Sequence, residues 1–139
     1  MKLTILGIPQ PKQSFRYTKK GIKYKPAGVA ENESNIRAQV REQLPAGFKP
    51  FTGPVVVTRL WFVFPPLKTV KKADRIIIET GGHIPKTTKP DLTDNLSKGL
   101  YDAMEGVVYL NDSQVYSEDG KRKYYGAIPR IEIEIEGIE

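Results

Sequence analysis

Apolar and polar positions along the chain predict several β-strands. Isoleucine and glutamate alternate through residues 131–136, which is typical of a strand with one buried and one solvated face. Residues 54–64 carry apolar side chains on both faces and therefore predict a central strand. Residues 1–9 predict a first strand, and residues 115–126 predict a strand that is interrupted or turned near Asp119-Gly120.

Two further segments have the helical period of about 3.6 residues. Residues 29–44 place apolar side chains on one face, and Pro45 follows as a stop. Residues 91–105 predict a second amphipathic helix. Pro90 suits its first turn, and Gly106 is expected to end it.

The order of these elements predicts an α+β fold, in which two main helices cover a mixed β-sheet of about four or five strands. At 139 residues the chain is expected to form one domain, residues 1–139. Residues 66–90 predict a long polar connection, a kind of segment that is usually functional or mobile. Residues 9–28 combine prolines, lysines and aromatics. They are either a loop that contacts nucleic acid or a hairpin whose aromatics pack on the body.

The second predicted helix has a chemically mixed polar face. Its polar side chains fall within an arc of about 100° and are Asp91, Asp94, Asn95, Lys98 and Asp102. Acids are common in a first helical turn, and Asp94 with Lys98 is also an ordinary surface pair. A solvated helix face is therefore the alternative to an active site.

A further acid, Asp112, follows the short apolar stretch at residues 107–110. This stretch predicts a short strand, and the Asn-Asp pair after it predicts a turn that can return Asp112 toward the helix. Carboxylates gathered inside a basic chain suggest a metal ion that must meet phosphate.

Charge and composition narrow the possible chemistry. The net charge is +6, and residues 1–30 contain seven Lys or Arg and no acid. This asymmetry indicates a polyanion partner, although a basic surface that only aids solubility is the alternative. Without cysteine and with a single histidine, His83, a thiolate or histidine-rich zinc site is disfavoured. Any metal is expected to be a hard cation on oxygen ligands, such as Mg²⁺ or Mn²⁺.

Two expectations follow for the remaining features. His83 lies in a glycine-rich stretch and is expected to be exposed and outside the catalytic set. No apolar run reaches membrane-spanning length, and the first residues lack the features of a signal peptide, so we expect a cytoplasmic protein without a membrane partner.

The pattern of these residues resembles the RusA family of Holliday-junction resolvases, which are phage and prophage endodeoxyribonucleases. The resemblance is carried by Lys-Pro-Asp at 89–91, Asp-Asn-Leu-Ser-Lys at 94–98, Asp102, and Asp-Ser-Gln-Val at 112–115. Two residues separate Asp91 from Asp94, where the family usually has one.

The resemblance implies a metal-dependent endodeoxyribonuclease that resolves four-way DNA junctions by paired symmetric nicks in recombination and repair. It implies a RusA-like fold, a homodimer and Mg²⁺, with Mn²⁺ as a possible substitute. Asp91, Asp94 and Asp112 are the expected metal ligands and catalytic residues, and Lys98 is expected to contact the scissile phosphate.

Two further sets of residues, one that orients the metal ligands and one that binds DNA, complete this hypothesis. Asn95 and Asp102 are expected to orient the ligands or Lys98. The expected DNA-binding residues are Lys12, Arg16, Lys19, Lys20, Lys86 and Lys89. A different structure-specific metal-dependent nuclease and a non-catalytic DNA-binding protein remain the alternatives.

Overall fold

The computed structural model describes residues 1–11, 16–24, 27–92 and 95–138. Its strands are β1 (Lys2–Leu6), β2 (Arg16–Tyr17), β3 (Lys23–Tyr24), β4 (Val55–Phe64), β5 (Ile84–Pro85), β6 (Val115–Glu118), β7 (Lys121–Tyr125) and β8 (Arg130–Gly137). Its helices are α1 (Ala27–Gln43), α2 (Lys72–Glu79) and α3 (Asn95–Met104), with a short 3₁₀ turn, η1 (Asp112–Gln114). None of the helices in the described ranges is long and apolar enough to cross a bilayer.

A mixed six-stranded sheet confirms the predicted α+β class, with more strands than the four or five expected and three helices in place of two. The strand order is β1-β8-β4-β7-β5, and β6 also pairs with β4. β4 is therefore central, as its two-sided apolar pattern predicts. β6 and β7 both run parallel to β4, with Gly120 between them at a φ of +61°. This break is the interruption expected near Asp119-Gly120.

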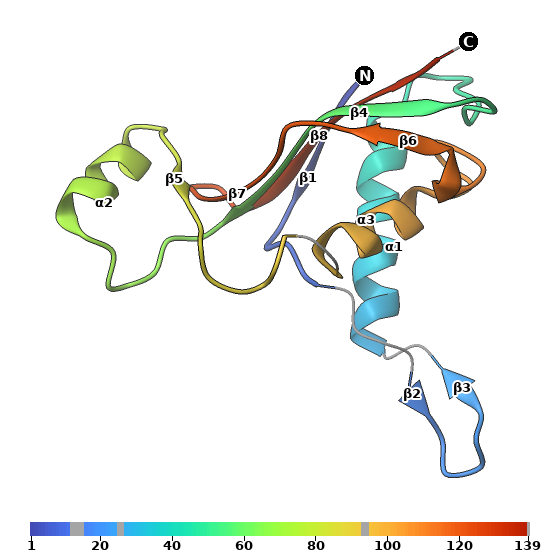
Figure 1. Cartoon of the computed structure of the whole chain (residues 1–139), viewed down its shortest axis with the longest axis horizontal. Coiled ribbons are helices and arrows are strands. Elements are labelled where there is room, and N and C mark those ends of the chain that lie inside the picture. The colour runs from blue at the N-terminus through green and yellow to red at the C-terminus, as the bar shows by residue number, and fades with distance from the viewer. Residues whose placement is uncertain (12–15, 25–26, 93–94, 139) are drawn as a thin grey trace.

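The core lies between the sheet and two helices, α1 and α3, which pack together on one side of it (Figure 1). Alternate residues of β4 and β8 point toward these helices, including Phe62 and Ile133. From the helices, Ile36, Val40 and Leu100 fill the facing layer. Helix α1 matches the prediction for residues 29–44: the apolar positions Val29, Ile36 and Val40 are buried, and Glu33 is buried with them.

Side-chain amides from α1 hold the edge strand β1. Gln43 exchanges hydrogen bonds of 2.9 and 2.6 Å with the backbone of Thr4, and Gln39 exchanges bonds of 2.8 and 2.9 Å with the backbone of Leu6. These amides occupy backbone groups that an added strand would otherwise pair with at this edge.

Three local predictions are wrong. Residues 66–90 contain α2 and β5 rather than a long connection that is irregular except for Ile76-Ile77-Ile78; α2 is a short amphipathic helix of 8 residues that buries only Ile78. Residues 107–110 do not form a strand: a turn covers residues 106–108, Val107, Val108 and Tyr109 are buried, and Leu110 is exposed. Helix α3 begins at Asn95, so Pro90 lies ahead of its first turn.

Candidate active site

Three carboxylates gather where α3 ends. Asp102 lies in the last turn of α3, Glu105 directly follows that helix, and Asp112 begins η1. One carboxylate oxygen from each residue lies within 4.8 Å of the others. We call Asp102, Glu105 and Asp112 the acidic cluster. Its all-oxygen donors suit a hard divalent cation.

A tight chain reversal builds this cluster. Gly106 has a φ of +78°, which glycine adopts without steric cost and which ends α3 as predicted. The amide of Val108 then donates to the Met104 carbonyl at 2.9 Å, and the amide of Gly106 donates to the Tyr109 carbonyl at 2.7 Å. Val108 and Tyr109 are fully buried. The chain turns back at residues 106–108, earlier than the predicted Asn111-Asp112 turn, and this reversal brings Asp112 to the C-terminal end of α3, the direction that was expected.

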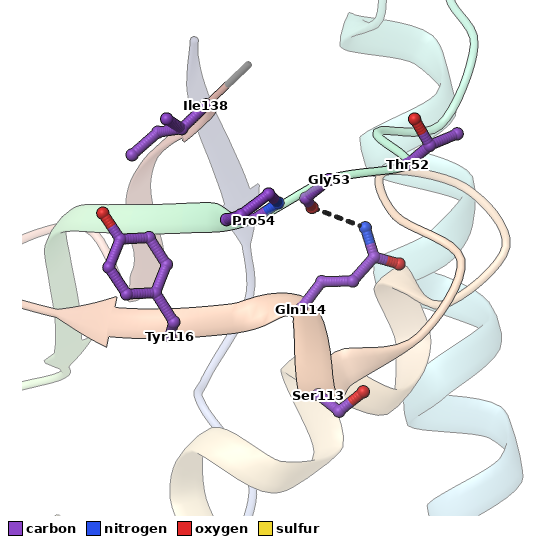
Figure 2. Close-up of a pocket in the computed structure, with 7 residues that line it drawn as sticks. All are labelled: Thr52, Gly53, Pro54, Ser113, Gln114, Tyr116 and Ile138. Carbon is purple, nitrogen blue, oxygen red and sulfur yellow. Dashed lines mark hydrogen bonds between the residues drawn. The ribbon is translucent and has the colours of Figure 1, made fainter.

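A hydrogen-bonded turn fixes the position of Asp112. Its backbone amide donates to Glu105 Oε1 at 2.8 Å. Asn111 and Gln114 form a reciprocal capping box around η1, in which the Gln114 side chain accepts from the Asn111 amide at 2.8 Å. Gln114 Nε2 donates to the carbonyls of Phe51 at 2.8 Å and Gly53 at 2.9 Å, and the second bond is drawn in Figure 2. The Asp112 turn is thereby tied to the segment that leads into β4.

The acidic cluster has a strongly negative environment. Burial raises the pKa of Asp112, and repulsion from Glu105 and Asp102 raises it further. The buried Tyr109 donates its hydroxyl to the Tyr101 carbonyl at 2.6 Å. Burial, followed by the charges of the three acids, raises the pKa of Tyr109 and keeps its phenol protonated. A divalent cation would relieve the repulsion among these carboxylates, so the residues present fit a metal site.

The predicted catalytic residues have different positions in the structure. Asp91 is exposed in the segment before α3, while Asp94 and the side chain of Asn95 lie outside the described residues. Lys98 is exposed on α3, one turn before Asp102. The ten-residue helix places Asp102 roughly 10 Å along its axis from Asn95, at about 1.5 Å per residue.

The structure therefore places Asp112 beside Asp102, the residue that was predicted only to orient the metal ligands. It also adds Glu105 to the group of acids. Sequence reasoning missed Glu105. Its spacing of three residues from Asp102 was the available signal, because such residues are neighbours on a helix surface.

A basic region lies at the other end of α3. The ammonium of Lys86 donates to Thr88 Oγ1 at 2.7 Å and to the Tyr125 hydroxyl at 3.1 Å. The ammonium of Lys123 donates to the carbonyls of Thr88 at 2.5 Å and Pro90 at 2.7 Å. Lys89 is exposed between them. Cations thus surround the segment that carries Asp91.

The predicted DNA-binding loop contains a two-stranded hairpin, β2–β3, which stands away from the main sheet (Figure 1). Lys19 and Lys20 are exposed at its turn, beside the exposed Ile22. Lys12 and the side chain of Arg16 lie outside the described residues. The described part of the hairpin presents cations to solvent, as a polyanion-binding surface requires.

His83 is not simply exposed, contrary to expectation. Its ring lies 5.7 Å from that of Trp61 and 5.3 Å from that of Tyr124, and its Nε2 lies 3.1 Å from Arg130 Nη2. Burial lowers the pKa of His83, and the positive charge of Arg130 lowers it further. A guanidinium has no acceptor atom, so Nε2 is the unprotonated acceptor of a neutral imidazole. This ring is part of a packed cluster, and it stays outside the candidate catalytic set.

A shallow groove of about 440 Å³ adjoins the Asp112 turn (Figure 2). Its walls are Thr52, Gly53, Pro54, Ser113, Gln114, Tyr116 and Ile138. The groove is mostly apolar and includes none of the three cluster carboxylates, so it lies beside the candidate site and is distinct from it.

The protein combines a basic overall charge, a mixed sheet and a cluster of three carboxylates that could hold a cation, which fits the class of proteins that act on a polyanion. Residues 7–136 match the family described as endodeoxyribonuclease RusA. Because the match spans most of the 139 residues, the chain belongs to the RusA endodeoxyribonuclease family, which indicates a Holliday-junction resolvase. No curated protein matches the chain at significant similarity.

Proposed function

We propose that this protein is a Mg²⁺-dependent endonuclease that cuts four-way DNA junctions by paired symmetric nicks, with a role in recombination and repair. The family match over residues 7–136 carries the nuclease assignment. The acidic cluster supports the metal dependence, because closely spaced carboxylates bind hard cations. The cytoplasm is the expected site of action.

Asp112 is the central metal ligand in this proposal. Asp102 and Glu105 are its partners in the described geometry. Asp91, which lies in the segment before α3, remains a predicted ligand from the family pattern, as does Asp94, which is outside the described residues. A bound divalent ion would lower the pKa of a coordinated water and neutralise charge on phosphate.

The chain's own residues have separate tasks in phosphodiester hydrolysis. The carboxylates of the acidic cluster are acceptors that can orient water at the end of α3. Lys98, exposed one turn before Asp102, supplies a positive charge for the phosphoryl oxygens. The buried Tyr109 stays protonated beneath the cluster and contributes packing rather than acid–base chemistry.

DNA binding in this proposal rests on phosphate contacts by scattered cations. Lys19 and Lys20 of the hairpin, with Lys86 and Lys89 before α3, are the described candidates, and Lys12 and Arg16 complete the predicted set. Affinity for DNA is therefore expected to fall steeply with salt. A homodimer would present two identical sites to the approximate two-fold symmetry of a four-way junction.

The test compares a synthetic mobile junction, a flap and a linear duplex, each with Mg²⁺, with Mn²⁺ and with chelator. We expect symmetric nicks in the junction that require the metal. Cleavage of linear duplex at the same rate would favour a less selective nuclease. Binding without cleavage of any substrate in either metal would favour a non-catalytic DNA-binding protein.

Variants separate the candidate ligands. Asp94→Asn and Asp102→Asn are compared with Asp112→Asn in cleavage and in junction binding. Each true ligand variant should lose cleavage while it keeps or gains junction affinity, because a charge that repels phosphate is removed. A set of variants that all cleave at the wild-type rate would contradict the proposed site.

A further inference from the structure

The segment between β5 and α3 is held by an unusual set of side chains. Thr88 lies at its centre, where its hydroxyl is 2.7 Å from the Lys86 ammonium and 3.0 Å from the Tyr125 hydroxyl. Its carbonyl accepts the 2.5 Å hydrogen bond from Lys123, which also donates to Pro90 at 2.7 Å. Side chains of the sheet therefore fix this segment on both sides of Lys89.

Regular structure gives the segment little support of its own. The last sheet hydrogen bond before it runs from the Lys86 amide to the Lys123 carbonyl at 2.9 Å. Residues 87–91 have no helical or strand assignment, and their described hydrogen bonds come from the side chains of Lys86, Tyr125 and Lys123. Without these bonds the backbone ahead of α3 would have far more conformational freedom.

Lys123 is suited to this task by its place on β7. Successive side chains of a strand point to opposite faces. Lys123 pairs in register with the buried Phe62 and reaches the segment, whereas its neighbour Arg122 pairs with Trp61 and is exposed on the other face. An ammonium group that bonds two carbonyls also places a positive charge next to the segment that carries Asp91.

We propose that Lys123 is a positioning residue for the reaction: its ammonium holds residues 88–90 so that Asp91, a predicted metal ligand, faces the scissile phosphate. This inference rests on the proposed function. Lys86 and Tyr125 assist by holding the Thr88 hydroxyl. Lys123 acts through the backbone of the segment and does not itself touch the reacting atoms.

The test uses Lys123→Met, which keeps the aliphatic stem, with Lys123→Arg as the conservative variant and Arg122→Met as the matched control. Backbone ¹⁵N order parameters of residues 87–91, apart from Pro90, are measured first by NMR relaxation. Wild type should have the value of rigid backbone, about 0.85, Lys123→Met should fall below about 0.6, Lys123→Arg should restore much of the rigidity, and Arg122→Met should match wild type. Unchanged order parameters in Lys123→Met would overturn the inference.

Junction cleavage is then measured against Mg²⁺ concentration. Loss of an outer group that orients metal ligands typically costs about 10–100-fold in metal affinity or activity. Lys123→Met should therefore need more Mg²⁺ for half-maximal cleavage, with junction binding in chelator within about threefold of wild type. A purely structural role would lower the melting temperature without moving the Mg²⁺ midpoint. Lower order parameters together with wild-type cleavage would also overturn the inference.

These two measurements separate failure of the inference from failure of the proposed function. A wild-type protein that cleaves no DNA would remove the function, whereas the order-parameter comparison would still decide whether Lys123 holds the segment.

Discussion

The acidic cluster at the end of α3 and the glutamates of β8 are both rich in carboxylates, but their surroundings differ. On β8, Glu132 Oε2 lies 3.1 Å from Arg59 Nη2 and 3.6 Å from Arg130 Nη2. Glu134 Oε1 lies 3.7 Å from Arg59 Nη1. Among the described residues, neither Glu105 nor Asp112 has an ion pair with Lys or Arg. Counter-charge, rather than the density of acids, therefore distinguishes Glu132 and Glu134 of β8 from Glu105 and Asp112.

Removal of Asp112 should give the largest effect. Asp112→Asn should lower junction cleavage by at least about 100-fold, the upper range for outer groups around a metal. It should also leave the fold as stable or slightly more stable, because repulsion with Glu105 and Asp102 is relieved. Cleavage rates and thermal melting are measured for the same preparation.

Glu134→Gln on β8 is the matched control for this variant. It removes one negative charge from an acid that has a cationic partner, so cleavage should stay near the wild-type rate. Equal losses of cleavage in both variants would mean that the acidic cluster has no special role.

Glu132→Gln should have the next largest effect, and on stability rather than on cleavage. Its carboxylate is 11% exposed and serves Arg59 and Arg130, which are themselves mostly buried. Removal of one partner of a buried ion pair lowers the free energy of unfolding by about 3–5 kcal/mol. We expect the lower end of this range, because the Glu132 carboxylate is partly accessible to solvent. Urea unfolding measures the change, and a loss below about 1 kcal/mol would show that solvent replaces these partners.

Added Mg²⁺ should stabilise the protein more modestly. A ligand at ten times its Kd that binds only the folded state contributes about 1.4 kcal/mol, which raises the melting temperature by a few degrees. The shift should vanish in Asp112→Asn and persist in Glu134→Gln. Equal shifts in both variants would place the bound ion away from the acidic cluster.

Short-range patterns predict much of the fold. The two-sided apolar sequence of Val55–Phe64 identifies the central strand, and the helical period of Ala27–Gln43 identifies α1. The positive φ of Gly106 confirms the expected end of α3. Each of these features depends on side chains within a few residues, which is the range that sequence periodicity covers.

The acidic cluster and the β8 ion pairs were harder to predict because they depend on contacts between distant residues. Glu105 joins Asp112 only because Val108 and Tyr109 are buried in a turn that the sequence predicts as a strand. Likewise, strict alternation predicts a solvated Glu132, yet Arg59 from β4 covers it. An alternating pattern identifies the face of a strand but not the cations that neighbouring strands bring to that face.

The smallest effect should be the pH dependence of stability that comes from His83, whose ring lies against Arg130 of β8. Its folded pKa is lowered by burial and by Arg130, so the unfolded chain binds the proton more readily. The stability that this ring contributes is therefore present above its ordinary pKa of 6.5 and is lost as pH falls through the lower folded value. Thermal melting across this range should show a small decline in wild type that is absent in His83→Gln. A decline of the same size in both proteins would assign the pH dependence to other groups and would show that Arg130 does not hold His83 neutral.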